Sequence, residues 1–228
     1  MIAVITSTIK PSTDKTYYTY EERLEQTIGT IKSLRRAGFS KIYLVDNSPL
    51  LNTDELTRLL KDKDVEAYHI DQYQFSNKGI NELLMLLYIY PRLAQNETIF
   101  KISGRYTVTP GFEKPAFEYM AVRSFDFNGK NSVISTRAYW VKNAQLFEAF
   151  LNDTLREVFA YPERVVGLRS FLKKFKNNFR QQGNTLNISI EFAAAQVLKR
   201  NGFKVTELKN LHIEGWVAGS DKPEKIIE

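Results

Sequence analysis

Three short apolar runs of the sequence each end in small polar or acidic residues. Short apolar runs with β-branched residues are typical of buried strands in a parallel sheet. Such sheets bind ligands at the carboxyl ends of their strands, so the residues at these ends are the first candidates for a binding site. They are Thr6 and Ser7 after the run from residue 2, Asp46 and Asn47 after the run 41–45, and Ser103 after the run 98–102.

Strands and helices alternate through the first hundred residues, and this alternation must position those polar residues. The patterns predict strands over 2–8, 41–45, 65–70 and 98–102, and helices over 20–37, 53–60 and 77–87. They further predict strand pieces at 132–136 and 138–141, helices over 145–159, 163–181 and 190–201, and a late strand over 204–208. The alternation predicts βαβ units, and therefore an α/β fold with a mainly parallel central sheet flanked by helices.

The composition sets limits on the class of protein. The chain has 228 residues, a formal net charge of +6 and no cysteine. A disulfide framework and a thiolate zinc site are therefore excluded, and an anionic partner is favoured. The sequence has no long apolar run and no signal-peptide pattern at its start, so we expect a cytoplasmic protein.

The order of four motifs resembles the family 2 glycosyltransferases and their relatives with the GT-A fold. The motifs are Ile5-Thr6-Ser7-Thr8, the stretch 24–31 (LEQTIGTI), Val45-Asp46-Asn47-Ser48 and Asn77-Lys78-Gly79. The resemblance covers roughly residues 2–112 and 186–205. It implies one GT-A-like, Rossmann-like domain over 1–228, with a nucleotide-sugar-binding half at 1–112 and an acceptor-side half at 113–228.

The resemblance also implies the residues that bind the donor. Thr6, Ser7 and Asp46, with Asn47 beside them, would line the nucleoside pocket, and Asn77 and Lys78 would meet phosphate at a helix start. Each motif has a purely structural alternative. A carboxylate that ends a strand often caps a turn, and Asn77 is a good N-terminal helix cap.

The chain departs from the family where GT-A enzymes carry a metal-binding DxD after the fourth strand. It has the string 101–106 (KISGRY) there, which resembles uncharacterised bacterial and viral polysaccharide glycosyltransferases. A divalent ion needs oxygen ligands that Lys101, Ser103 and Arg105 do not supply together, so no metal cofactor is expected, although one stays compatible with the fold. We expect Arg105 to stabilise the diphosphate instead, with Lys101 or Lys78 as second candidates, unless Ser-Gly-Arg is only a surface turn.

Inverting transfer needs a general base for the acceptor hydroxyl, and the family supplies it just before a late helix. Glu191, before the stretch 192–202, has that position, with Asp71 in reserve. Glu191 could equally be an acidic residue that stabilises the first turn of a helix. Arg137, Tyr139 and Trp140 lie where relatives build the acceptor site, although aromatic residues of this kind are more often core.

The predicted helix over 163–181 is basic and amphipathic. Its apolar residues fall on one stripe with lysines and arginines around it. Such a helix is suited to peripheral contact with an anionic membrane or to an anionic glycan, although basic residues at the margins of an ordinary packed helix are as common.

Together these features predict an enzyme, a hexosyltransferase-like glycosyltransferase of polysaccharide biosynthesis. It would move a sugar from a nucleotide-sugar donor to a glycan or lipid-linked acceptor. A nucleotidyltransferase is the first alternative, but the N-terminal region has no glycine-rich phosphate loop. A basic RNA-binding module is the second, but no common RNA-binding signature is present, so no nucleic-acid partner is expected.

Overall fold

A mainly parallel sheet forms the centre of the molecule. The computed structural model describes the chain except residues 13–16, 62, 130–131, 162–166, 180–187 and 218–223. In this described part, the central sheet has seven strands in the order β10-β6-β9-β4-β1-β2-β3. They are β1 (Ile2–Ser7), β2 (Lys41–Asp46), β3 (Glu66–His69), β4 (Ile99–Ser103), β6 (Met120–Val122), β9 (Ala138–Val141) and β10 (Val205–Glu207). Only β9 runs antiparallel to its two neighbours among these strands, so the predicted α/β class is confirmed.

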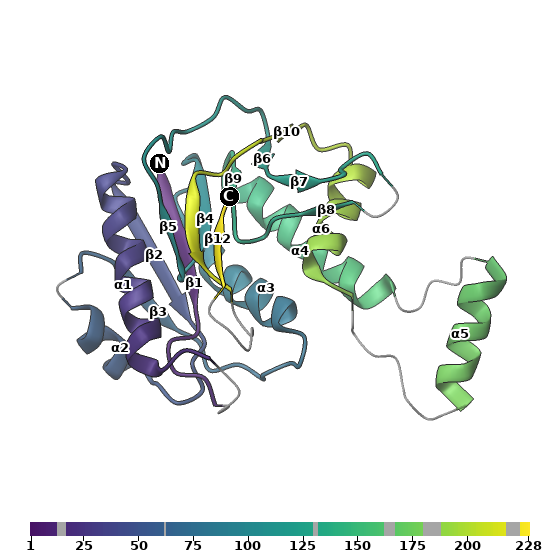
Figure 1. Cartoon of the computed structure of the whole chain (residues 1–228), viewed down its shortest axis with the longest axis horizontal. Coiled ribbons are helices and arrows are strands. Elements are labelled where there is room, and N and C mark those ends of the chain that lie inside the picture. Colours follow the sequence, from purple (N-terminus) through teal and green to yellow (C-terminus); the bar gives the residue numbers. More distant parts are fainter. Residues whose placement is uncertain (13–16, 62, 130–131, 162–166, 180–187, 218–223) are drawn as a thin grey trace.

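Helices cover both faces of this sheet (Figure 1). One face carries α1 (Tyr20–Arg36) and α2 (Thr53–Leu60), and the other carries α3 (Lys78–Ile89), α4 (Ala144–Ala160) and α6 (Ile190–Arg200). Successive side chains of a strand point to opposite faces, so Val4 packs with the α3 side and Ile5 with the α1 side. Burial of strands on both faces is why the sequence shows continuous apolar runs there.

Several short strands were not predicted from the sequence. They are β5 (Tyr106–Val108), β7 (Ser124–Phe125), β11 (Ile213–Trp216) and β12 (Lys225–Ile227). In addition, β8 (Val133–Ile134) is shorter than the predicted strand, and β6 of the central sheet was missed. A three-stranded sheet joins β12, β11 and β5, and a hairpin joins β7 and β8. Strands of two to four residues are too short to show an alternating pattern.

Local hydrogen bonds explain where the helices begin. Thr19 and Glu22 form a capping box at α1, and Asn52 and Glu55 form another at α2. Asn77 caps α3 by accepting a hydrogen bond from the Gly79 N–H at 3.0 Å.

The remaining helices are a short 3-10 turn, η1 (Tyr90–Arg92), and the basic helix α5 (Gly167–Phe179). The predicted basic helix over 163–181 is confirmed for residues 167–179. Its outer parts, with Arg164 and Arg180, lie outside the described residues. Among the helices that the structure describes, none combines the length and apolar character needed to cross a bilayer.

The first turn of α3 has no room for a side chain at Gly79. A Cβ atom added there would lie 2.0 Å from Cγ2 of Ile190, a buried β-branched residue in the first turn of α6. We expect Gly79→Ala to lower the free energy of unfolding by about 1–3 kcal/mol through overpacking. Gly29→Ala in α1 is the matched control, since its nearest atom lies 3.7 Å away, and it should raise stability by up to about 1 kcal/mol. Denaturant unfolding measures both; equal effects of the two variants would contradict this packing.

Candidate functional site

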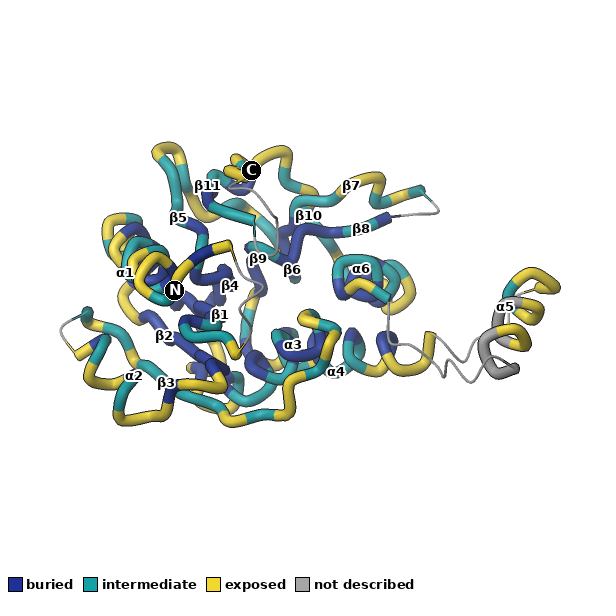
Figure 2. Tube along the Cα trace, turned by 60° about the horizontal axis from the view of Figure 1, so that its bottom comes forward, coloured by how far each residue is buried: buried dark blue, intermediate teal, exposed yellow. Residues whose placement is uncertain are grey.

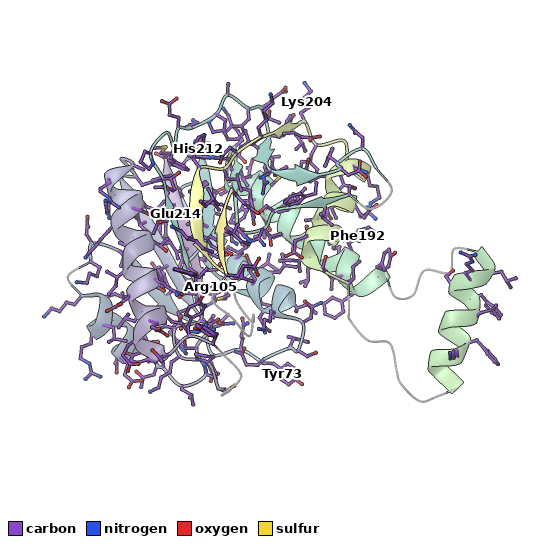
Figure 3. All side chains as sticks on the ribbon, in the orientation of Figure 1. Tyr73, Arg105, Phe192, Lys204, His212 and Glu214 are labelled. Carbon is purple, nitrogen blue, oxygen red and sulfur yellow. The ribbon has the colours of Figure 1, made fainter. Side chains whose placement is uncertain are left out.

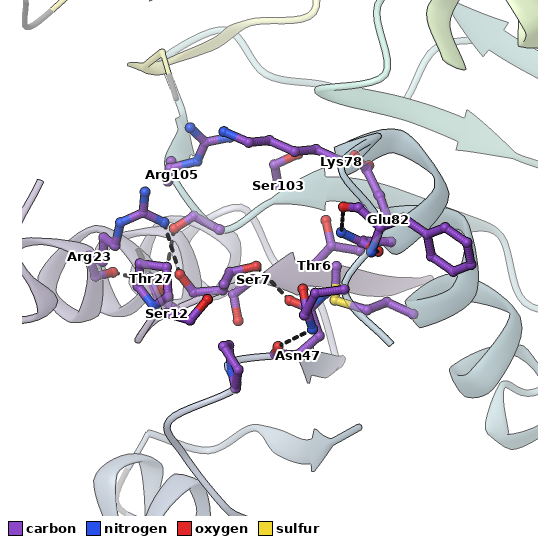
Figure 4. Close-up of a pocket in the computed structure, with 18 of the residues that line it drawn as sticks. Thr6, Ser7, Ser12, Arg23, Thr27, Asn47, Lys78, Glu82, Ser103 and Arg105 are labelled. Atoms are coloured by element: carbon purple, nitrogen blue, oxygen red, sulfur yellow. Dashed lines mark hydrogen bonds between the residues drawn. The ribbon is translucent and has the colours of Figure 1, made fainter. Parts of the chain in front are cut away.

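A cavity of about 460 Å³ opens where the strand order of the central sheet reverses. From β1 the chain first builds β2 and β3 on one side and then returns to add β4 on the other side. Open α/β sheets bind ligands at such a switch point, outside the carboxyl ends of the strands. The cavity lies between the first turns of α1 and α3, with the ends of β1 and β4 between them (Figure 4). Its polar and charged lining includes Thr6, Ser7, Thr8, Ser12, Arg23, Thr27, Asn47, Gln74, Ser76, Lys78, Asn81, Glu82, Ser103 and Arg105.

Three cations and one carboxylate line this cavity. The cations are Arg23, Lys78 and Arg105, and the carboxylate is Glu82. Within the described residues, no carboxylate lies within ion-pair distance of any of the three cations. Arg23 is buried and Arg105 is partly buried, whereas Lys78 is exposed. Desolvation makes a charge without an ion pair costly at the two arginine positions. The excess of positive charge therefore indicates a site for an anion.

Burial strengthens this interpretation for the two arginines. Burial lowers the pKa of Arg105, and burial together with the positive charge of Arg105 lowers the pKa of Arg23. Nη1 of Arg105 and Nε of Arg23 are shielded from solvent, and neither has a hydrogen-bond partner among the described residues. Arg23 uses Nη1 to donate to the Thr8 carbonyl at 2.9 Å, which holds its side chain beside the cavity. Both guanidinium groups stay charged and retain donors for a ligand.

The turn after β4 delivers Arg105 to the site. Gly104 donates from its N–H to the Thr6 carbonyl at 2.8 Å and accepts from Thr27 Oγ1 at 3.1 Å. A Cβ atom at Gly104 would lie 3.2 Å from Ser7 Cβ, so the turn fits closely between β1 and α1. Arg105 consequently lies between α1 and α3 (Figure 3). The Ser-Gly-Arg turn is therefore part of the cavity wall and not an exposed surface turn.

Lys101 lies behind the cavity and not in it. Because side chains alternate along β4, Lys101 points to the α3 side, where its register partners are Val4 and Tyr139. It is fully buried, forms an ion pair with Glu82, and donates to the Thr136 carbonyl at 2.5 Å and to Ser103 Oγ at 3.2 Å. Burial lowers the pKa of Lys101, and the Glu82 charge opposes that shift. Lys101 was predicted as a second candidate for contact with the diphosphate. In the structure its side chain instead holds Glu82 in position and does not line the cavity.

Glu82 was missed by the sequence analysis. It stands alone as a carboxylate in the apolar helix α3, where one polar residue is easily taken for the exposed face. The signal that could have found it is Lys101, because a lysine within a fully buried strand requires a partner of opposite charge.

The predicted donor-binding residues divide into two groups. Thr6, Ser7, Asn47, Lys78 and Ser103 line the cavity. Asp46 and Asn77 do not, and their side chains are used by the fold. Asn77 accepts from Gly79 N–H and donates to the Ile188 carbonyl at 3.0 Å, which ties the start of α3 to the segment before α6.

Asp46 is completely buried and organises the loop after β1. Its carboxylate accepts hydrogen bonds from Ser7 Oγ at 2.6 Å, Ile9 N–H at 2.9 Å and Ser48 N–H at 2.8 Å. With these donors satisfied inside the protein, the carboxylate holds the polar ends of β1 and β2 together. This placement matches the turn-capping alternative, and the Asp46 side chain is not part of the cavity lining.

Glu191 lies in the first turn of α6, outside the cavity lining. It accepts from Thr136 Oγ1 at 3.3 Å, and the Thr136 carbonyl in turn accepts from Lys101. Glu191 is therefore one residue removed from the Glu82–Lys101 pair. Asp71, the reserve carboxylate, is exposed in the loop after β3.

The predicted acceptor-binding residues are engaged elsewhere. Tyr139 and Trp140 are 2% and 1% exposed and belong to the core on opposite faces of β9, as the core alternative requires. Arg137 donates from Nε to Tyr106 Oη at 3.1 Å and pairs with the Glu228 carboxylate. None of the three lines the cavity.

The donor set around the cavity does not resemble a preformed metal site. In the parts of the chain that the structure describes, no three histidine or acidic side chains gather closely enough to hold a metal ion. Glu82 is the one carboxylate of the cavity lining, and it is paired with Lys101.

Comparison with known proteins gives distant structural likeness and nothing closer. No protein-family model matches the chain, and no curated protein matches its sequence. CTP:phosphocholine cytidylyltransferase from Streptococcus pneumoniae is similar, with 12% identity and a TM-score of 0.48 over 94% of this chain and 92% of that one. The PaToxG glycosyltransferase has 13% identity and a TM-score of 0.47 over 88% of this chain and 68% of that one. The inositol-1-phosphate CTP transferase from T. maritima has 14% identity and a TM-score of 0.48 over 91% of this chain and 84% of that one. Likeness at this level assigns no activity to the chain.

The buried Asp46 carboxylate should matter to the protein without any ligand. The Asp46 carboxylate accepts from three donors, and Asp46→Asn replaces one of its oxygens with an NH2 group that can only donate. We expect this change to lower the free energy of unfolding by about 3 kcal/mol. Asp71→Asn, at an exposed aspartate, should change it by less than about 0.5 kcal/mol. Urea unfolding of the ligand-free variants makes the comparison. If Asp46→Asn kept full stability and only weakened ligand binding, Asp46 would be a ligand contact after all.

Proposed function

We propose that the chain is a glycosyltransferase that takes a sugar from a nucleoside diphosphate sugar and transfers it to a hydroxyl acceptor. The observation that carries this proposal is Arg105, whose shielded Nη1 has no partner among the described residues and which lines the cavity at the switch point of the sheet. A diphosphate supplies the negative charge that this position lacks, and a guanidinium binds phosphate oxygens in a bidentate way. The order of the four sequence motifs, whose polar residues Thr6, Ser7 and Asn47 line the same cavity, supports a nucleotide-sugar donor.

The cavity also has a wall suited to the nucleoside. Phe75, Pro11 and Pro49 contribute apolar surface on which a base can stack. The loop that carries Phe75 is held firmly, because Asn81 accepts from the Phe75 N–H and donates to its carbonyl, both at 2.9 Å. The hydroxyl of Ser12 and the amide of Asn47 lie in the same lining and offer hydrogen bonds to the base or the ribose.

Transfer breaks the bond between the anomeric carbon and the diphosphate oxygen while the acceptor oxygen bonds to that carbon. Negative charge grows on the departing diphosphate, and Arg105, Arg23 and Lys78 are placed to stabilise it. Cations that are already in place at the site need little reorganisation during the reaction. They would perform the electrostatic task that a divalent ion performs in relatives with DxD, which makes the proposed reaction metal-independent.

The acceptor hydroxyl loses its proton as its oxygen attacks, and we assign that proton to Glu82. Glu82 lines the cavity, whereas Glu191 lies behind Thr136. The ion pair with fully buried Lys101 holds the Glu82 carboxylate in place at the cavity wall. Glu82 lies in α3, across the cavity from Arg23 in α1 (Figure 4). A diphosphate held mainly by the two arginines would leave Glu82 on the acceptor side, which displacement from the face opposite the leaving group requires.

Removal of the Arg105 charge should separate ligand binding from stability. We expect Arg105→Gln to weaken the binding of nucleoside diphosphates about 10- to 100-fold, because a hydrogen bond to a charged group contributes about 1.5–3 kcal/mol. The free energy of unfolding of the ligand-free variant should stay equal or rise, since a buried cation without an ion pair is costly. Arg58→Gln, at an exposed arginine of α2, is the control and should change neither quantity. Calorimetry with a panel of nucleoside diphosphates measures the affinities.

The products and the metal requirement test the function itself. A sugar transferase releases a nucleoside diphosphate from a nucleotide sugar, whereas a nucleotidyltransferase releases pyrophosphate from a nucleoside triphosphate. We expect the nucleoside diphosphate, in amounts that are unaffected by EDTA. Pyrophosphate release would replace the proposed reaction. Activity that disappears with EDTA and returns with Mn²⁺ would show that Arg105 does not substitute for a metal.

The two carboxylates can be distinguished by paired substitutions. We expect Glu82→Gln to lower kcat by about 10²–10⁴-fold with donor affinity retained, and Glu191→Gln to keep most of the activity. Since Glu82→Gln leaves Lys101 buried without its partner, the double variant Glu82→Gln with Lys101→Met should recover stability but not activity. Full activity of the double variant would remove Glu82 from the role of base. Loss of activity in Glu191→Gln would assign that role to Glu191.

A further inference from the structure

Helix α5 is basic along its whole described length. The segment Gly167–Phe179 contains Arg169, Lys173, Lys174 and Lys176 but no aspartate or glutamate. No other element of this length in the described chain has this one-sided charge, since α1, α4 and α6 all contain acidic residues. The helix therefore presents a positive potential that the rest of its own sequence does not neutralise.

The same helix carries an exposed apolar stripe. A helix turns by 100° per residue, which places Leu168, Phe171, Leu172 and Phe175 within a sector of about 100°. Their exposed fractions are 72%, 52%, 54% and 62%. Arg169 and Lys176 border the stripe on one side, at 60° or less from its edge by the same geometry. Phe171 and Phe175 stack on each other with ring centroids 6.5 Å apart, so the apolar surface is continuous.

The two hydrophobic core clusters of the described residues do not cover this stripe. Neither of the two hydrophobic core clusters includes a residue of α5. Figures 1 and 2 show α5 apart from the remaining elements in two different views. A contiguous exposed apolar surface with charged margins is the usual mark of an interaction site.

We infer that α5 is a membrane-docking helix that lies in the interface of an anionic lipid bilayer. Such a bilayer provides negative headgroups for basic side chains such as Arg169 and Lys176, and an apolar layer for the stripe. A second copy of α5 would cover the stripe but would bring like charges together. An acidic glycan would neutralise the charges but would leave the phenylalanine rings in water. The bilayer interface accommodates both the basic residues and the apolar stripe of the helix at once.

Vesicle binding of the whole chain tests this inference without any sugar donor, so it does not depend on the proposed transferase activity. Co-sedimentation should be strong with phosphatidylcholine vesicles that contain about one-third phosphatidylglycerol and weak with phosphatidylcholine alone.

Neutralisation by Arg169→Gln with Lys176→Gln should weaken binding roughly 25-fold, at about fivefold for each charge near the surface. Phe171→Ser with Phe175→Ser should weaken it at least about tenfold, because two apolar anchors are lost. A Phe171→Trp variant should show a blue shift of its emission when these vesicles are added.

Matched controls keep the result specific to α5. Lys32→Gln with Arg36→Gln removes two exposed charges from α1, and Tyr73→Ser removes an aromatic ring that is 77% exposed; both should bind vesicles like the unchanged protein. Circular dichroism should show that every variant is folded. Binding that is unaffected by the α5 variants, or absent with the anionic vesicles, would overturn the inference. A dimer in solution that Phe171→Ser with Phe175→Ser dissolves, without vesicle binding, would assign the stripe to a second copy instead.

Discussion

The reversal of strand order beside β1 is the constraint on which the candidate site depends. Strands β2 and β3 lie on one side of β1, and β4 lies on the other, so the chain segments that leave β1 and β4 diverge to different partners. The segment after β1 leads toward α1, and the turn after β4 leads into β5. The cavity opens between the parts of these two connections that the structure describes. Thr6 and Ser103, which are register partners at the ends of these strands, therefore line a cavity that the topology itself leaves open.

Two carboxylates beside the cavity, buried Asp46 and partly exposed Glu82, stabilise its walls in different ways. Asp46 binds three donors of its own fold and keeps the loop after β1 against the end of β2. Glu82 instead shares a buried ion pair with Lys101, and part of its side chain remains open to the cavity, with 20% of its surface exposed. The difference is physical: a carboxylate whose acceptors are all used is structural, whereas one with a free edge beside a cavity can accept a proton. The network continues from Lys101 through Thr136 to Glu191, so α3, β4 and α6 are joined behind the site.

Much of the fold could be predicted from the sequence, because long elements carry a periodic pattern. The strands around Val4, Val45 and Ile102 and the helix that starts at Tyr20 were predicted within one or two residues of their observed ends. The short strands β5, β11 and β12 could not be predicted, since their pairing is decided by distant partners. For the site, the strand ends identified Thr6, Ser7 and Ser103. They did not show which of the adjacent polar residues have side chains that face the cavity. That choice depends on local hydrogen bonds, which turn Asp46 inward, and on strand alternation, which directs Lys101 toward α3.

The cations of the cavity conflict with stability in a way that points to a ligand. Residues that serve only the fold normally have partners when they are buried. In this chain Lys101 pairs with Glu82, Glu157 with Arg200, and Glu228 with Arg123 and Arg137, while buried Asp46 accepts three hydrogen bonds. Arg105 and Arg23 have no ion pair within the described residues, and the charge of Arg105 lowers the pKa of Arg23. Two like charges are retained together when a third, opposite charge is present for part of the protein's working cycle. A diphosphate carries enough negative charge to contact both guanidinium groups at once. Under the proposed function, binding of such a ligand would offset the cost of keeping two cations side by side.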